Sequence, residues 1–233
     1  MNTGVILQAR MTSSRLPGKV LLNLNGKPML ERQINRILQV VDSGKLVVAT
    51  SSEGSDDKIE EFCSSIGIKV VRGSLNNVYC RFSKVLLDCN WDSFVRLTGD
   101  CPFFMPRLLD RMFMESKKTE FDFFSNTLNR DFPRGLDIEI VKKNSFMKLR
   151  DLSLTIEELE HVTLGFHNHR DIFKLINYSE GRNLAKYRWT VDTQSDFEFA
   201  QKVFERFKGH EEKFDIEDIL KLMEEDSKFA YFE

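Results

Sequence analysis

Compact apolar runs alternate along the chain with longer segments whose apolar residues recur at helical spacing. The compact runs, which predict buried strands, are residues 5–7, 46–49, 68–71 and 94–97. The segments with apolar side chains three and four positions apart, which predict amphipathic helices, are residues 28–41, 56–66 and 76–88. Strands that alternate with helices are typical of a mostly parallel sheet covered on both faces, so the pattern predicts an α/β fold.

Capping residues indicate where these helices begin and end. Pro28 is expected in the first turn of the first helix. Ser55 is expected to cap the second helix, which should stop at Gly67. Further along the chain, Thr155 and Glu158 have the spacing of a capping box and therefore predict another helix start.

The alternation becomes less regular in the second half of the chain. Thr193 is predicted to cap a helix that extends to Phe207, and the acidic stretch 211–226 predicts a terminal helix or a dimer element. No Pro-, Gly- or Ser-rich linker and no internal repeat divides residues 1–233, which predicts a single domain. Short strands are predicted near residues 121–124, 136–141 and 187–191.

The composition narrows the class of protein. The chain has 233 residues with 41% hydrophobic and 30% charged residues, as ordinary soluble domains have. Its net charge of −2 argues against a protein built to hold duplex nucleic acid or an anionic membrane. No apolar run reaches the roughly 18 residues of a membrane helix, and residues 1–9 lack the pattern of a signal peptide. The four cysteines show no metal-type spacing and predict reduced thiols in a cytoplasmic protein.

The charge is unevenly distributed along the sequence. Residues 1–30 carry four cations and no acid, whereas residues 192–233 carry 13 acids against 6 Lys or Arg. The acidic end is typical of solvated helices. The cations of the first region lie among turn residues instead of on a helix face, so they are candidates for a small anionic ligand.

Ligands of open parallel sheets bind at the carboxyl ends of the strands, and residues 8–19 follow the first predicted strand. The segment matches neither the dinucleotide glycine fingerprint nor the P-loop spacing. It nevertheless offers loop N–H groups, hydroxyls at residues 12–14 and the cations Arg10, Arg15 and Lys19. Arginine grips phosphate oxygens in pairs and lysine acts as a point charge, so the segment suits a triphosphate. A solvated basic loop is the alternative interpretation.

Two single carboxylates follow other predicted strands. Asp100 lies between Gly99 and the Cys101-Pro102 pair, beyond the strand at residues 94–97. Asp192 follows the predicted strand at residues 187–191. Each of them alone has the alternative interpretation of a helix cap. Because one or two carboxylates suffice for a magnesium ion that also binds phosphates, the pair indicates a shared Mg²⁺ site.

Residues 8–19 together with 98–102 resemble the sugar-activating cytidylyltransferases, in the branch named for spore coat polysaccharide biosynthesis. The synthetases of CMP-Kdo and CMP-sialic acid are relatives of that branch. The resemblance covers roughly residues 3–205, and 206–233 match nothing in it. Leu164-Gly165 replaces a segment in which the branch usually has a proline. Further matching segments, in order, are residues 26–30, 48–50, 72–74, 95–102, 125–127, 135–139, 160–163 and 188–193.

The resemblance implies a Rossmann-like α/β/α sandwich of the nucleotide-diphospho-sugar transferase type. It implies a nucleotide-binding half over residues 1–105, an acceptor-binding half over 106–205 and a C-terminal helical extension over 206–233. The implied reaction transfers CMP from CTP to an acidic sugar or phosphorylated acceptor for surface polysaccharide biosynthesis, with Mg²⁺ as cofactor and pyrophosphate as the leaving group. Relatives are often dimers, so a homodimer is possible.

The resemblance also assigns roles to individual residues. Arg15, Lys19, Asp100 and Asp192 would be catalytic, and Asp100 and Asp192 would hold the metal. The acceptor would meet Asp137, Glu139 and His161. The nucleotide-binding residues would be Ala9, Arg10, Ser14, Arg15, Lys19, Thr50, Arg72, Gly73 and Asp100.

Two other functions remain open on the sequence. A glycosyltransferase of similar fold would consume a nucleotide sugar, but such enzymes commonly hold their metal through an Asp-x-Asp pair, which Thr98-Gly99-Asp100 is not. A non-catalytic nucleotide-binding subunit is the other alternative. Retention of both carboxylates and all three loop cations argues against it, because decayed sites usually lose one.

Overall fold

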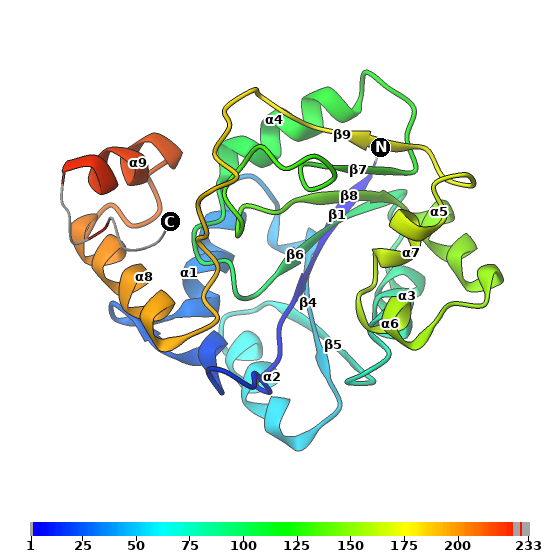
Figure 1. Cartoon of the computed structure of the whole chain (residues 1–233). Helices are drawn as coiled ribbons and strands as arrows, with labels where there is room; N and C mark the ends of the chain where they lie inside the picture. Colours follow the sequence, from blue (N-terminus) through cyan, green and yellow to red (C-terminus); the bar gives the residue numbers. More distant parts are fainter. Residues whose placement is uncertain (1, 226–228, 230–233) are drawn as a thin grey trace.

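One seven-stranded sheet forms the centre of the molecule (Figure 1). The structure, a computed structural model, describes residues 2–225 and 229. In spatial order the strands are β5 (Lys69–Gly73), β4 (Leu46–Ser51), β1 (Thr3–Gln8), β6 (Ser93–Thr98), β8 (Glu139–Lys142), β7 (Phe123–Ser125) and β9 (Leu175–Asn177).

The first four strands of this order run parallel, and only β8 runs against its neighbours. The predicted α/β fold with a mostly parallel sheet is confirmed. The chain leaves β1 towards β4 on one side and later returns to β6 on the other side. A sheet of this kind opens a crevice at the carboxyl ends of the two strands where the order reverses, here β1 and β6.

Helices cover both faces of the sheet, which confirms the predicted α/β/α sandwich (Figure 1). Alternate residues of β1 divide between the two sides: Val5 and Leu7 join one core cluster and Ile6 joins the other. The first cluster packs against α1 (Met29–Ile37), α2 (Asp57–Ser65), α4 (Pro106–Ser116), α8 (Gln194–Arg206) and α9 (Ile216–Glu225). The second packs against α3 (Val78–Asp88), α5 (Lys143–Lys148), α6 (Ile156–Glu160) and α7 (Leu164–Asn168).

The prediction of a strand near residues 187–191 is wrong. This segment forms one isolated bridge, between Arg134 and Arg188, and no ladder. Three backbone bonds hold it: the Arg134 N–H group donates to the Tyr187 carbonyl, the Trp189 N–H group to the Arg134 carbonyl and the Val191 N–H group to the Asp100 carbonyl. Trp189 is 1% exposed, so its apolar character reflects burial in the core. The prediction missed β9, a three-residue strand with half-buried side chains and no apolar run of its own.

The helix ends agree with the sequence in part. The capping boxes at Thr155 and Thr193 are formed, and Gly67 follows α2 with a φ of +73°. The predicted Ser55 cap is wrong, because a 3-10 turn at Gly54–Asp56 precedes α2. Pro28 lies in the short strand β3 (Lys27–Pro28) at the N-cap of α1 instead of inside its first turn.

The segment after α8 packs back onto α1 through a buried arginine. Arg36 is fully buried and donates to the carbonyls of Phe104, Glu211 and Phe214, and its guanidinium lies 4.1 Å from the Phe214 ring centre. The predicted terminal helix is present as α9, and residues 226–228 and 230–233 of the predicted extension lie outside the described residues. In the described part of the chain, no helix is long and apolar enough to cross a membrane.

Candidate active site

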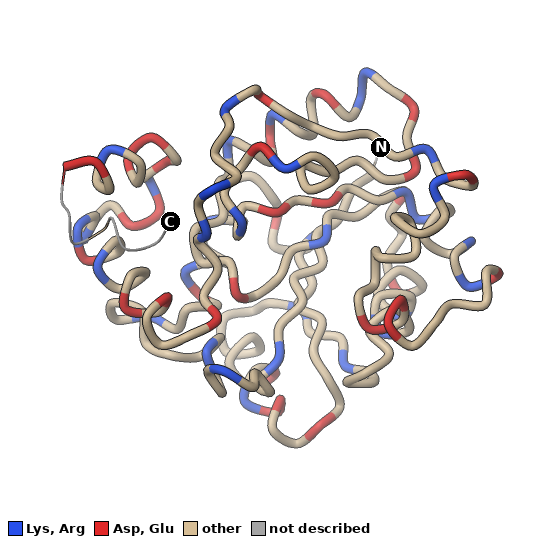
Figure 2. The backbone as a smooth tube through the Cα atoms, viewed as in Figure 1, with Lys and Arg blue, Asp and Glu red and all other residues tan. Residues whose placement is uncertain are grey.

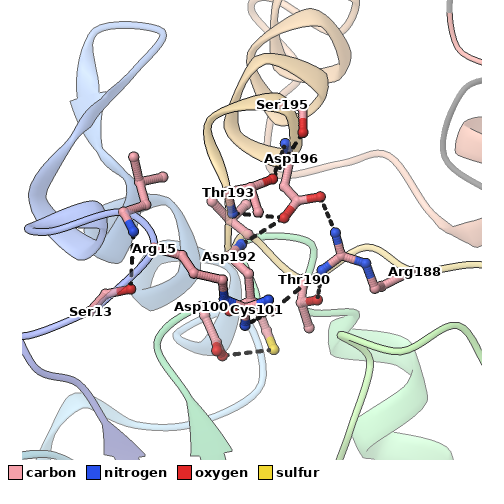
Figure 3. A network of polar contacts seen from close by, with 12 residues as sticks. Ser13, Arg15, Asp100, Cys101, Arg188, Thr190, Asp192, Thr193, Ser195 and Asp196 are labelled. Atoms are coloured by element: carbon pink, nitrogen blue, oxygen red, sulfur yellow. Dashed lines mark hydrogen bonds and ion pairs between the residues drawn. The ribbon is translucent and has the colours of Figure 1, made fainter.

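A cleft lies over the carboxyl ends of β1 and β6, at the crevice expected from the strand order. Three separate parts of the chain line it: the loop after β1, the loop after β6 and the start of α8 (Figure 3). Its lining residues are Gln8, Ala9, Arg10, Ser13, Ser14, Arg15, Lys19, Val20, Thr98, Gly99, Asp100 and Asp192.

Lys19 joins the three parts at the floor of the cleft. Its ammonium nitrogen lies 2.7 Å from the Val191 carbonyl oxygen, 2.9 Å from Asp192 Oδ1 and 3.4 Å from Asp100 Oδ2. The two carboxylates predicted to share a metal therefore converge on one cationic group, although no strand precedes Asp192. Val191 brings Asp192 to this position, because its N–H group bonds to the Asp100 carbonyl at 2.8 Å.

Arginines hold the second oxygen of Asp192. Arg15 approaches Asp192 Oδ2 at 3.1 Å and Arg188 approaches the same oxygen at 3.3 Å (Figure 3). Arg188 also pairs with Asp196, whose other oxygen accepts the N–H groups of Asp192 and Thr193. Burial would raise the pKa of Asp196, but the hydrogen bonds from Arg188 and these N–H groups outweigh it and lower the pKa. The N-terminus of α8 is thus built to fix the Asp192 carboxylate.

Asp100 stays ionised although its side chain is only 30% exposed. Burial works to raise its pKa, but the Lys19 charge and the hydrogen bonds from Thr98 and Cys101 lower the pKa below 3.8. Burial raises the pKa of the Cys101 thiol well above 9.0, and its sulfur donates to Asp100 Oδ1 at 3.4 Å. Cys101 is therefore a protonated thiol that supports Asp100, not a nucleophile.

The donor set fits a magnesium ion better than a softer metal. Two carboxylates already share one cation, the Lys19 ammonium, which shows that their oxygens can converge on a single positive charge. Within the described residues, no group of three or more His, Cys, Asp or Glu could form a complete protein site. Mg²⁺ is commonly held by one or two carboxylates, with the rest of its oxygens supplied by phosphates and water.

The other predicted nucleotide-binding residues are not brought into this cleft. The Thr50 hydroxyl donates to Asp56 at 2.9 Å, and Gly73 ends β5 beside α3. The Arg72 guanidinium is already occupied: it pairs with Asp57 and Glu60 at 2.7 Å and donates to two backbone carbonyls. A role for Thr50, Arg72 or Gly73 in nucleotide binding stays a prediction.

Of the predicted acceptor residues, Glu139 begins β8, which lies on the opposite side of β6 from β1. Glu139 Oε2 accepts Arg96 at 2.8 Å and the Thr163 hydroxyl at 3.0 Å. Arg96 also reaches Oε1 of Gln8, which lines the cleft, at 3.4 Å. Arg130 binds both oxygens of Asp137 and is close enough to Glu139 and Cys101 to interact with them electrostatically. The His161 side chain is exposed.

The sequence pattern of one family, described as cytidylyltransferase, matches residues 4–226. The chain belongs to the cytidylyltransferase family.

Individual relatives agree with this assignment. The spore coat polysaccharide biosynthesis protein SpsF of Bacillus subtilis is 36% identical over 209 residues, which is 86% of this chain and 85% of that protein. A solved cytidylyltransferase from Leptospira borgpetersenii is 32% identical with a TM-score of 0.92, covering 98% of this chain and 96% of that one. A CMP:2-keto-3-deoxy-manno-octonic acid synthetase solved with CTP shares the fold, with a TM-score of 0.70 at 20% identity.

The sequence pattern did not predict two residues of this cytidylyltransferase that hold parts of the cleft in place. Asp56 accepts the Met11 N–H group at 2.7 Å and the Ser51 N–H group at 3.0 Å, and so anchors the loop after β1 to the end of β4. Arg188 links Asp192 to Asp196. The spacing of Arg188, Asp192 and Asp196, four residues apart each time, is a signal that could have revealed this second group.

Proposed function

We propose that this cytidylyltransferase transfers CMP from CTP to a small acidic sugar or phosphorylated acceptor and releases pyrophosphate, in surface polysaccharide biosynthesis. One observation carries the proposal: Lys19 and Arg15 meet Asp100 and Asp192 in a single cleft at the β1–β6 crevice. Cations for a triphosphate and carboxylates for its metal are then within reach of the same ligand. The name of SpsF and the CTP bound to the similar synthetase support the pathway and the donor.

In the proposed reaction an acceptor oxygen bonds to the α-phosphorus of CTP while the bond from that phosphorus to the bridging oxygen of pyrophosphate breaks. Arg10, Ser14 and the N–H groups after Ala9 hold the triphosphate, and Arg15 and Lys19 stabilise the charge on the departing pyrophosphate. Asp100 and Asp192 hold Mg²⁺, which when bound neutralises charge on the phosphate oxygens. The protein otherwise aligns the two reactants, which supplies several kcal/mol.

The acceptor in this proposal lies beside Gln8, towards β8. Asp137, Glu139 and His161 are the residues on that side that the family resemblance assigns to it. An acceptor that brings its own phosphate needs no base, because its oxygen is already ionised. A hydroxyl acceptor needs to lose a proton, and the exposed imidazole of His161 is the candidate to take it.

The proposal predicts that CTP alone among the four nucleoside triphosphates supports pyrophosphate release, and that release requires Mg²⁺ and an acceptor. Release is measured with each triphosphate against a panel of acidic sugars and sugar phosphates. Mass spectrometry of the product distinguishes a CMP-sugar from a CDP product. Failure of CTP to bind would contradict the proposed donor, and consumption of a nucleotide sugar instead would identify a glycosyltransferase.

A further inference from the structure

We propose that the ammonium group of Lys19 occupies the position of the metal in the ligand-free protein, so that a divalent cation binds tightly only after a nucleotide has drawn Lys19 away. The inference rests on the proposed function, since it takes a triphosphate as the group that draws Lys19. It concerns the order and coupling of binding, which neither the family assignment nor the reaction dictates.

The ammonium group of Lys19 has a full set of hydrogen-bond partners. A lysine ammonium has three N–H donors and no acceptor. Lys19 has three oxygen partners, the Val191 carbonyl and one oxygen each of Asp100 and Asp192, at 2.7 to 3.4 Å. The residue is 8% exposed. With all three donors occupied, Lys19 can bind a phosphate only by giving up contacts with these oxygens.

A divalent cation and the Lys19 ammonium would also repel each other. A divalent cation held by Asp100 and Asp192 would lie close to an ammonium that contacts the same two carboxylates. Like charges at such close range repel strongly in a partly buried site, because the effective dielectric there is lower than in water, and a divalent ion doubles the repulsion that a monovalent ion would feel. The metal and the ammonium therefore compete for these carboxylates. A triphosphate gives Lys19 other anionic oxygens and at the same time supplies ligands to the metal.

The surroundings allow this exchange without a change of fold. The Lys19 backbone begins the 3-10 helix Lys19–Leu21, directly after Gly18, and Val20 is 2% exposed. The backbone is thus fixed, while four rotatable side-chain bonds leave the ammonium free to move. Arg15 and Arg188 hold the other oxygen of Asp192, so this carboxylate keeps its place when Lys19 leaves.

Linkage makes the effect reciprocal. If a nucleotide raises the affinity for the metal by some factor, the metal raises the affinity for that nucleotide by the same factor. Removing the Lys19 charge should therefore do two things at once: strengthen metal binding in the absence of nucleotide, and weaken the coupling between the two ligands.

The test measures Mn²⁺ binding directly, by electron paramagnetic resonance of free Mn²⁺, for the full chain with and without a CTP analogue that cannot be cleaved at the α-phosphorus. For the unsubstituted protein we expect the analogue to tighten Mn²⁺ binding at least tenfold. For Lys19→Met we expect Mn²⁺ alone to bind at least tenfold more tightly than to the unsubstituted protein. Lys19→Arg keeps a cation there and should leave Mn²⁺ binding weak, and Lys27→Met, on an exposed lysine that pairs with Glu31, should change nothing.

Each outcome bears on the inference. Unchanged or weaker Mn²⁺ binding in a folded Lys19→Met protein, checked by circular dichroism, would overturn it. Where the analogue itself is shown to bind, equally tight Mn²⁺ binding to the unsubstituted protein with and without it would overturn the inference too. The arm without nucleotide separates the two proposals: if CTP is not the donor, Lys19→Met still gains Mn²⁺ affinity while the CTP analogue has no effect on any variant.

Discussion

Asp100→Asn is expected to lower kcat by roughly three orders of magnitude while the protein stays folded. Asn keeps the shape of the side chain but removes the charge that balances Lys19 and would hold the metal. A metal stabilises the transition state by several kcal/mol, and each 1.36 kcal/mol corresponds to a factor of ten in rate. Steady-state pyrophosphate release with CTP and Mg²⁺ measures the loss, and circular dichroism checks the fold.

Asp192→Asn should lower kcat similarly, with an additional loss of stability. Asp192 takes part in ion pairs with Arg15, Lys19 and Arg188, whereas Lys19 is the one ion-pair partner of Asp100 among the residues that the structure describes. The matched control is Asp88→Asn, an exposed carboxylate at the end of α3. Full activity in either cleft variant would refute the metal assignment. A loss of activity in the Asp88→Asn control would point to a general effect of the substitution.

Arg96→Met is expected to reduce the free energy of unfolding by about 3 kcal/mol, the largest stability effect we anticipate. Arg96 on β6 pairs with Glu139 on β8 at 2.8 Å, and the two side chains are only 17% and 10% exposed. Removing the cation leaves Glu139 as a largely buried charge whose remaining side-chain hydrogen bond, within the described part of the chain, comes from the Thr163 hydroxyl. Urea unfolding measures the change as a lower midpoint at unchanged slope.

A second substitution tests the reason for this loss. Arg96→Met combined with Glu139→Gln removes the stranded charge, so the double variant should regain at least half of the stability lost in Arg96→Met. Lys118→Met breaks the exposed pair with Glu115 and should cost less than about 1 kcal/mol. If Arg96→Met costs no more than Lys118→Met, the pair between β6 and β8 does not stabilise this part of the sheet.

The predictable part of the fold follows from burial. The strands β1, β4 and β6 are mostly buried on both faces, so their residues form apolar runs that the sequence displays directly. The edge strand β5 is only partly buried, but its two valines follow Ile68 and so extend an apolar run. Strand β9 has only half-buried side chains, so it left no such signal. The segment before α8 was wrongly predicted to be a strand. Trp189 gives it apolar character, but this side chain is buried by tertiary packing and not by a strand ladder.

The site was predictable where its residues follow strands and unpredictable where they depend on distant partners. Charge and turn pattern pointed to Arg15, Lys19 and Asp100, which the cleft brings together. Asp192 also lies there, although the strand that suggested it is absent. No local pattern could show that Asp56 bonds to a loop 45 residues earlier, or that Arg72 is occupied by α2.

We propose that one cleft holds the triphosphate of CTP and its metal together. Diffraction from a crystal soaked with Mn²⁺ and a CTP analogue that cannot be cleaved at the α-phosphorus tests it most directly, because Mn²⁺ gives an anomalous signal. We predict an anomalous peak between the Asp100 and Asp192 carboxylates, with phosphate density beside Arg15 and Lys19. Nucleotide density away from the loop after β1, or an anomalous peak that touches neither carboxylate, would contradict this proposal.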